Sequence, residues 1–414
     1  MFLSHRPIGG RISAIASKSQ AHRLLICAAF ADTSTQIICA ERSADIDATA
    51  RCLQALGAQI EYRDDRFHVT PRQKAVPMAE MDCGESGSTL RFLLPVVAAL
   101  GCGGEFVLHG RLAQRPLSPL WEELEAHGIT LSRPSENRLR VKGQLQGGDF
   151  TLAGNVSSQF ISGLLFALPL LQESSTLYLS FPLESAPYVR LTEAALDKFG
   201  LNLCQTENAW HINGNQTLRS PQTLTVEGDW SNSAFWLCAG ALSQGMTVTN
   251  LDPESAQGDR KILDILLSFG GDISINSNEI TISPRPLRGI DLNVRDIPDL
   301  VPPVALVAAC AEGVTHITGA ARLRIKESDR LESVSAAIRV LGGNVTVHED
   351  GLTIVGGALR GGCVDSHNDH RIAMLAAIAS AVCPEGVELL GHDAVAKSYP
   401  NFWNDFQNLV MKYV

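Results

Sequence analysis

The stretch SGSTLRFLLPVVAAL (Ser86–Leu100) shows the feature on which the fold depends. It begins with small polar residues, continues as an apolar helix-like run, and is followed by a glycine turn and the strand-like GGEFVLHG. Five other segments have the same order of features. They begin at Ser17, Ser157, Ser231, Asp299 and Asn368, and with Ser86 included the steps between starts are 69, 71, 74, 68 and 69 residues. The sequence therefore predicts a repeat of about 70 residues.

A second helix between these starts tends to close on glycine. The glycines are Gly57, Gly128, Gly200, Gly270 and Gly342, at steps of 71, 72, 70 and 72 residues. Glycine just past the last helical turn readily adopts the left-handed conformation that ends a helix. A strand-rich stretch follows each one. We expect the C-terminal helix, Asn401–Val414, to be the sixth copy, without a capping glycine.

These two markers predict an α/β fold of six βαβαββ units, which divide naturally into two sets of three. An entirely apolar helix such as Arg371–Val382 should be buried within a layer of other elements. A purely structural scaffold of α/β repeats would explain the apolar faces. It would not explain the polar residues that gather at the starts of the buried helices.

Composition excludes several classes of protein. The 414 residues include 34 basic and 44 acidic side chains, a net charge of −10, so an overall basic surface for nucleic acid is absent. The ten cysteines form no Cys-x-x-Cys pair, which argues against a zinc or redox motif. The apolar runs are shorter than the roughly 20 residues that cross a bilayer. With no secretory signal evident at the N-terminus, we expect a soluble, cytoplasmic protein.

Three cations stand at or near the starts of otherwise apolar helices: Lys18, Arg23 and Arg91. A helix N-terminus offers unpaired N–H groups and partial positive charge, which suit phosphate and carboxylate. The serines beside them are also good helix caps, and capping alone would explain any one of them. Burying a cation, however, is costly unless an anion pairs with it. The pattern therefore favours a site for small anions.

Three further clusters are dense in charge. RLRIKESDRLES (Arg322–Ser333) could equally be a solvated helix start with internal ion pairs. HNDHRIAM (His367–Met374) places Asp369, His370 and Arg371 before a buried helix, with too few ligands at suitable spacing for a metal site. Lys397 precedes SYPNFW, where an exposed lysine is the ordinary interpretation.

At these residues the sequence resembles the 5-enolpyruvylshikimate-3-phosphate synthase family. Matching pieces occur in order over nearly the whole chain. They are SKSQAHR (17–23), GESGSTLRFL (84–93), Gln-Arg-Pro (114–116), GNVSSQF (154–160), SAPYVRLT (185–192), EGDWSNSAF (227–235), IPDLVP (297–302), RIKESDRL (324–331), NDHRIAM (368–374) and AKSYPNFW (396–403). Each piece alone is weak, and the combination is highly specific.

The resemblance implies two globular domains of three units each, with helix N-termini facing a cleft between them. The chain should cross between domains near Ala16 and again before Gly228. One domain is then discontinuous, combining residues 1–16 with 228–414. It would carry the acid/base residues and part of the phosphoenolpyruvate site. Residues 17–227 would carry most of the shikimate 3-phosphate site.

The implied reaction transfers the enolpyruvyl group of phosphoenolpyruvate to the 5-hydroxyl of shikimate 3-phosphate, through a tetrahedral intermediate, with release of phosphate. It serves chorismate and aromatic amino acid biosynthesis. The resemblance implies no metal and no organic cofactor. The expected partners are these small anions, without nucleic acid or membrane, and we expect a monomer.

The family's site residues carry over by position. For shikimate 3-phosphate they are Lys18, Ser19, Arg23, Ser157, Ser158, Gln159, Ser185, Asp299, Arg322 and Lys326. For phosphoenolpyruvate they are Lys18, Gly87, Arg115, Gln159, Arg330, Arg371 and Lys397. Asp299 is the candidate to accept the proton of the 5-hydroxyl, and Glu327 the candidate to protonate the methylene carbon. Lys18 is the rival proton-transfer group.

Two positions depart from the family pattern. Many members have Asn where this chain has Glu85, whose carboxylate would repel an anionic substrate unless it points away or pairs with a cation. Arg322 also occupies a position where Asn is common in the family, so the resemblance does not define how Arg322 would contact shikimate 3-phosphate.

Two alternative functions would fit part of this pattern. The related transferase that moves enolpyruvyl onto UDP-N-acetylglucosamine has Lys-Asn where this chain has Lys18-Ser19, and a reactive cysteine that HGRLAQRPL (109–117) lacks. A non-enzymatic pseudo-sixfold scaffold such as a DNA sliding clamp would need a basic surface facing DNA.

Overall fold

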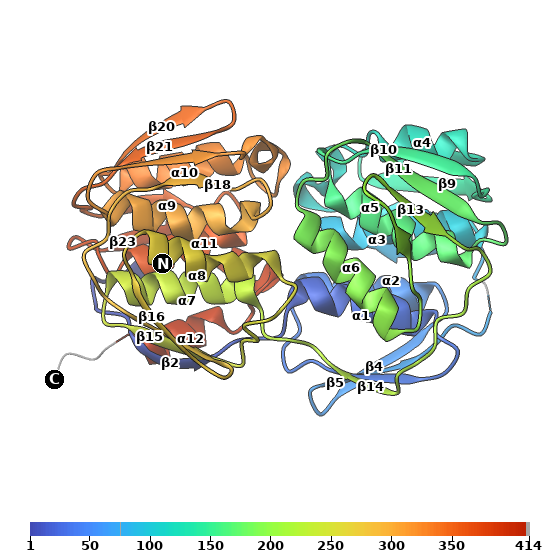
Figure 1. Ribbon diagram of the computed structural model, residues 1–414, viewed down its shortest axis with the longest axis horizontal. Coiled ribbons are helices and arrows are strands. Elements are labelled where there is room, and N and C mark those ends of the chain that lie inside the picture. Colours follow the sequence, from blue (N-terminus) through green and yellow to red (C-terminus); the bar gives the residue numbers. More distant parts are fainter. Residues whose placement is uncertain (75, 411–414) are drawn as a thin grey trace. The chain divides into compact units, whose positions relative to one another are not determined.

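The computed structural model describes residues 1–74 and 76–410. The chain forms two compact units (Figure 1). The central unit is Ala16–Val226, and the discontinuous unit combines Met1–Ile15 with the chain from Glu227 onward. Each unit has its own hydrophobic core. Both observed boundaries lie one residue before those expected from the sequence.

One repeat of the central unit shows the pattern in its simplest form. Strand β6 (Ala79–Asp82) pairs in parallel with β7 (Gly104–Val107). β7 pairs antiparallel with β9 (Arg138–Gly143), which pairs antiparallel with β8 (Ile129–Ser135). Helices α3 and α4 connect β6 to β7 and β7 to β8. In chain order the elements are β6 (Ala79–Asp82), α3 (Gly87–Leu100), β7 (Gly104–Val107), α4 (Leu120–Ala126), β8 (Ile129–Ser135) and β9 (Arg138–Gly143). This is one βαβαββ unit.

Two other repeats complete the central unit with the same strand order. The first comprises α1 (Lys18–Ala29), β3 (Thr35–Ile38), α2 (Ala44–Ala55), β4 (Gln59–Arg63), β5 (Arg66–Thr70) and the late strand β14 (Thr223–Thr225). The other comprises β10 (Asp149–Ala153), α5 (Ser158–Ala167), β11 (Ser175–Phe181), α6 (Ala186–Lys198), β12 (Cys204–Gln205) and β13 (Ala209–Ile212).

The discontinuous unit contains two full repeats. One comprises β2 (Gly10–Ser13), α7 (Trp230–Leu242), β15 (Met246–Thr249), α8 (Ile262–Ser268), β16 (Asp272–Asn276) and β17 (Glu279–Ser283). The next comprises β18 (Asp291–Asn293), α9 (Val301–Cys310), β19 (Val314–Thr318), α10 (Arg330–Val340), β20 (Asn344–His348) and β21 (Gly351–Val355).

Up to residue 410, the sixth repeat shows the βαβα part of the pattern. It comprises β22 (Gly362–Asp365), α11 (His370–Ala379), β23 (Val387–Leu390) and α12 (Phe402–Leu409). Its third strand is β1 (Phe2–Leu3), from the start of the chain, which pairs antiparallel with β23. Helix α12 is shorter than the predicted Asn401–Val414, whose residues 411–414 lie outside those described.

In each unit, the sheet of the first repeat is completed by a strand that lies far away in the sequence. β2 pairs in parallel with β15, more than 200 residues later in the sequence, and β14 pairs in parallel with β3. Each of these two distant strands occupies the position that the first strand holds in the other repeats. The chain thus passes between units just after β2 and just after β14, the two strands that complete a sheet with a strand distant in the sequence.

The predicted helix ends agree with the structure. The five glycines of the second marker all have positive φ, at +104°, +91°, +78°, +100° and +93° in chain order. At the other end, Ser86 and Ser157 cap α3 and α5 by accepting hydrogen bonds from Thr89 N and Gln159 N. Capping is therefore part of what these serines do. Within the described residues, every helix is too short or too polar to cross a membrane.

The helices that begin at the polar clusters are the buried ones. In the discontinuous unit, α7, α9 and α11 contact one another. Every residue of α11 is buried. A helix without a polar face is stable only when other elements surround it, so the polar groups of these helices concentrate at their N-terminal ends.

Candidate active site

In the central unit, Lys18 is the first residue of α1 and forms an ion pair with Asp45 in the first turn of α2. The two charged atoms, Lys18 Nζ and Asp45 Oδ2, lie 2.8 Å apart. Both side chains are mostly buried. A lysine at the start of a helix is disfavoured by the helix dipole, and the Asp45 carboxylate offsets that cost.

Arg23 is buried one turn further along α1 and binds neutral oxygen atoms. It donates to Thr192 Oγ1 at 2.8 Å, to Tyr188 O at 2.8 Å and to Ser19 O at 2.5 Å. Its guanidinium also lies over the Phe92 ring. Burial lowers the pKa of Arg23 to about 10. A desolvated cation held by neutral acceptors is suited to receive an anion.

The start of α5 places Gln159 in a polar network. Gln159 Oε1 accepts a hydrogen bond from Arg91 Nη1 at 2.7 Å, and its Nε2 donates to Ser88 Oγ at 2.9 Å. Ser158 is buried at the first position of the helix. Ser185, before α6, is also buried and has a φ of +55°. Non-glycine residues held in the left-handed region occur often at functional sites.

Gly87 and Arg115 lie in contact in the same unit. A Cβ atom on Gly87 would lie 2.6 Å from Arg115 Nη1. That separation is far below ordinary van der Waals contact, so only glycine leaves room for the guanidinium in this position. The main chain after Arg115 is held by Arg91, whose Nη2 donates to Pro116 O at 3.2 Å.

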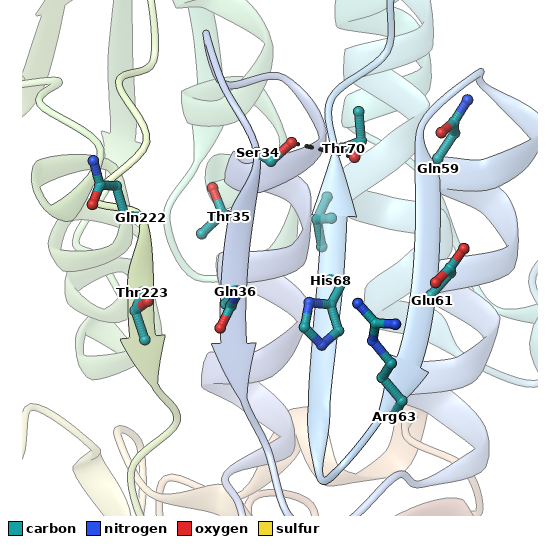
Figure 2. Close-up of a pocket in the computed structure, with 11 residues that line it drawn as sticks. Ser34, Thr35, Gln36, Gln59, Glu61, Arg63, His68, Thr70, Gln222 and Thr223 are labelled. Carbon is teal, nitrogen blue, oxygen red and sulfur yellow. Dashed lines mark hydrogen bonds between the residues drawn. The ribbon is translucent and has the colours of Figure 1, made fainter.

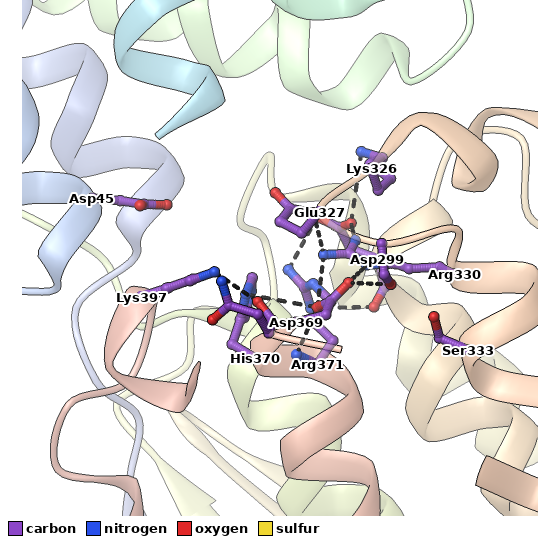
Figure 3. A network of polar contacts seen from close by, with 12 residues as sticks. Asp45, Asp299, Lys326, Glu327, Arg330, Ser333, Asp369, His370, Arg371 and Lys397 are labelled. Carbon is purple, nitrogen blue, oxygen red and sulfur yellow. Dashed lines mark hydrogen bonds and ion pairs between the residues drawn. The ribbon is translucent and has the colours of Figure 1, made fainter. Parts of the chain in front are cut away.

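In the discontinuous unit, Arg330 is the centre of a charged network (Figure 3). Its Nη1 lies 2.8 Å from Asp299 Oδ1, its Nη2 lies 2.5 Å from Glu327 Oε2, and its Nε lies 2.7 Å from Asp369 Oδ2. The Arg330 side chain is 2% exposed. Burial disfavours its charge, but the carboxylates of Asp369, Glu327 and Asp299 raise its pKa, so Arg330 stays ionised.

Asp299 is surrounded by cations. Arg371 Nη2 lies 3.0 Å from Asp299 Oδ2, and Lys326 Nζ lies 3.8 Å from Asp299 Oδ1. Burial raises the pKa of the Asp299 carboxyl, but Arg371, Lys326 and Arg330 outweigh burial and hold that pKa well below its usual range. Burial also lowers the pKa of Lys326, to about 8, against the opposing effect of Asp299.

Lys397 and Arg322 make main-chain contacts. Lys397 ends the 3₁₀ segment His392–Lys397, and its Nζ donates to Asn368 O at 2.6 Å. Asn368 has a φ of +56° just before α11. Arg322 Nη2 donates to Arg295 O at 2.8 Å.

The predicted residues divide between the two units, and the contacts above link only some of them within each unit. The central unit holds Lys18, Ser19, Arg23, Gly87, Arg115, Ser157, Ser158, Gln159 and Ser185. The discontinuous unit holds Asp299, Arg322, Lys326, Glu327, Arg330, Arg371 and Lys397.

The predicted site set omitted several partners of these residues. Asp45 pairs with Lys18, Thr192 accepts from Arg23, and Asp369 pairs with Arg330. Asp259 is buried beside Ser231, and burial followed by the charge of Asp299 raises the pKa of its carboxyl to about 6. Thr192 and Asp369 lie within motifs of the resemblance. Asp45 and Asp259 stand outside those motifs and carry no signal in the sequence.

One surface hollow lies apart from both groups. It has a volume of about 480 Å³ on the outer face of the sheet containing β3, β4, β5 and β14 (Figure 2). Its lining includes Gln36, Glu61 and His68, and none of the predicted site residues. Across residues 1–74 and 76–410, His, Cys, Asp and Glu form no cluster of three or more that could hold a metal ion.

The family model for EPSP synthase (3-phosphoshikimate 1-carboxyvinyltransferase) matches residues 4–406. The chain belongs to the EPSP synthase family. Among its EPSP synthase relatives, the 3-phosphoshikimate 1-carboxyvinyltransferase of Clostridium kluyveri is 41% identical over 406 residues, covering 97% of this chain and 95% of the relative. The enzyme of that name from Clostridium acetobutylicum is 41% identical over 408 residues, with the same shares covered.

Solved structures agree with this family. The EPSP synthase of Acinetobacter baumannii superposes with a TM-score of 0.81 at 25% identity, covering 99% of this chain and 97% of that one. An enolpyruvyl transferase, NikO from Streptomyces tendae, has a TM-score of 0.77 at 18% identity, a likeness of fold alone. The predicted family and the six-repeat α/β architecture are therefore confirmed.

Proposed function

We propose that this chain transfers the enolpyruvyl group of phosphoenolpyruvate to the 5-hydroxyl of shikimate 3-phosphate and releases phosphate. The observation that carries the proposal is the placement of Asp299 between Arg330 and Arg371, with Glu327 on the other side of Arg330. Two planar cations for the carboxylate and phosphate of a small anion stand beside two carboxyl groups for proton transfer. Membership of the family supports the choice of reaction.

Shikimate 3-phosphate is assigned to the central unit's polar helix starts, and the family resemblance adds three further residues to the proposed set. Arg23 offers a desolvated guanidinium for the phosphate. The proposed hydrogen-bonding residues of the central unit are Lys18, Ser19, Ser157, Ser158, Gln159 and Ser185. The residues that the family resemblance adds are Asp299, Arg322 and Lys326. The buried cation with neutral acceptors supports the phosphate assignment most directly.

Phosphoenolpyruvate is assigned to Lys18, Gly87, Arg115, Gln159, Arg330, Arg371 and Lys397. Its carboxylate and phosphate compete with Asp299 and Glu327 for the arginines that these side chains contact. A substrate anion that draws Arg371 and Arg330 away removes the charges that depress the pKa of Asp299. Substrate binding would in this way convert a weak base into one able to accept the hydroxyl proton.

The chemistry then has two stages. In the addition stage, Asp299 accepts the proton of the 5-hydroxyl and the hydroxyl oxygen bonds to C2 of phosphoenolpyruvate. Glu327 protonates the methylene carbon in the same stage. In the elimination stage, Glu327 takes a proton from the new methyl group, the bond between C2 and the phosphate oxygen breaks to restore the double bond, and the departing phosphate takes up the proton that Asp299 holds. Lys18 is the alternative proton-transfer group. The arginines and lysines balance the negative charge that remains on the phosphate throughout.

The decisive experiment is an assay of phosphate release from phosphoenolpyruvate with the purified protein. Release should require shikimate 3-phosphate. Comparable turnover with UDP-N-acetylglucosamine would replace the proposal with the alternative transferase. The further proposals that the protein is cytoplasmic and monomeric rest on composition and on the expected substrates, and sedimentation at the assay concentration tests the second.

A further inference from the structure

Within the central unit, the loop Gly84–Gly87 contacts the short 3₁₀ segment Gly110–Gln114 at both of the segment's ends. At one end, His109 N donates to Gly84 O at 2.9 Å, and the Glu85 side chain lies against Gly110. A Cβ on Gly110 would lie 2.5 Å from Glu85 Oε2. At the other end, the Arg115 guanidinium lies against Gly87. One four-residue loop therefore supports both ends of the segment.

The segment between these contacts is short and internally bonded. Leu112 N donates to His109 O at 3.1 Å, and Arg115 N donates to Leu112 O at 3.3 Å. Leu112 is buried and anchors the segment in the core. Because these hydrogen bonds make the segment a single rigid helical turn, a displacement of Gly110 should also displace Arg115.

We infer that Glu85 is a positioning residue that holds the Gly110–Gln114 segment and so places Arg115 over Gly87. The inference rests on the proposed role of Arg115 in binding phosphoenolpyruvate. This role also explains why the Glu85 carboxylate is tolerated near the proposed phosphoenolpyruvate site, since the side chain is directed to Gly110. Glu85 immediately precedes the cap of α3, where the partial positive charge of the helix N-terminus favours a carboxylate.

Hydrogen exchange tests the contact without any substrate. In Glu85→Ala, amides of residues 109–115 should exchange faster by about tenfold than in the unaltered protein, because the brace on Gly110 is lost. Glu61→Ala, which removes an exposed carboxylate on β4, is the matched control and should leave these amides unchanged. Equal exchange in Glu85→Ala and the unaltered protein would overturn the inference.

Steady-state kinetics distinguish a positioning role of the Glu85 side chain from a direct effect of its charge on the substrate. Glu85→Ala should raise KM for phosphoenolpyruvate by about tenfold with a much smaller change in KM for shikimate 3-phosphate, because Arg115 is displaced. Glu85→Gln keeps the shape of the side chain and should restore both constants to near their parental values. A lower KM for phosphoenolpyruvate in Glu85→Gln would show that the carboxylate charge faces the substrate, and would contradict the positioning role.

A double variant shows whether Glu85 acts through Arg115. Arg115→Met should raise KM for phosphoenolpyruvate, and adding Glu85→Ala should raise it no further. Independent, multiplicative losses would contradict the inference. If the unaltered protein shows no turnover with these substrates, the proposed function fails, while the exchange experiment still decides whether Glu85 braces the segment.

Discussion

Arg371 holds Asp299 at two points: its Nη2 lies 3.0 Å from Asp299 Oδ2, and its Nη1 donates to the main-chain oxygen of Asp299 at 3.2 Å. The two contacts fix both the position of the residue and the direction of its carboxylate. Arg330 holds the second carboxylate oxygen. Asp299 is thus oriented by two arginines that are themselves assigned to the substrate.

Asp299→Asn should lower kcat by about 10²- to 10⁴-fold, the usual cost of losing one general base. KM should change much less, because the cations that neutralise the substrates remain. Steady-state kinetics, with calorimetric affinity for shikimate 3-phosphate, measure both. Asp365→Asn, at an exposed carboxylate before α11, is the control and should behave as the unaltered protein. Near-parental turnover in Asp299→Asn would make Lys18 the leading base.

Glu327→Gln should also reduce kcat more than it changes KM. The amide keeps a contact with Arg330 but cannot deliver a proton to the methylene carbon at a useful rate. Transfer of solvent deuterium into the methyl position of the tetrahedral intermediate, followed by quenching, measures that step. Parental incorporation in Glu327→Gln would remove Glu327 from its role.

The pKa of Lys326 predicts an alkaline limit. With a pKa lowered to about 8, Lys326 is cationic below that pH and neutral above it. Because kcat/KM reports groups of the free enzyme, kcat/KM should fall as the pH rises through about 8. Lys326→Arg keeps its charge and should move this fall to higher pH. A fall at the same pH in both proteins would assign the limit to another group.

Gly87→Ala should raise KM for phosphoenolpyruvate more than KM for shikimate 3-phosphate. The added methyl group would lie 2.6 Å from Arg115 Nη1 and must displace the guanidinium. A matched control is Gly357→Ala, where no heavy atom lies within 4 Å of the new methyl group. Equal losses for both substrates would show that Gly87 serves helix packing instead.

Arg23→Met should destabilise the central unit as well as weaken shikimate 3-phosphate binding. The change leaves buried oxygens of Tyr188 and Thr192 with one fewer donor, a cost of about 1–3 kcal/mol. Urea unfolding followed by tryptophan fluorescence measures the loss. Arg66→Met removes an exposed arginine on β5 and should have little effect. Unchanged stability in Arg23→Met would mean that water replaces the guanidinium.

Local periodicity was sufficient to predict the repeats, because each signal lies within a few residues. Apolar runs must be buried, and glycine after a helix lowers the cost of the left-handed turn, as the positive φ at Gly57 and Gly342 illustrates. The resemblance of ordered motifs then predicted the family and the chemistry-bearing residues, from Lys18 to Lys397.

Tertiary structure decided what depends on distant partners. The family resemblance grouped residues 1–16 with 228–414, but nothing in the sequence showed that β2 pairs with β15 or that β1 supplies the third strand of the sixth sheet, because pairing depends on long-range closure. The sequence likewise did not show that Lys18 meets Asp45, or that Asp299 is shared by Arg330 and Arg371. Side-chain charges carry their type in the sequence, but their pKa values depend on the neighbours and burial that only folding supplies.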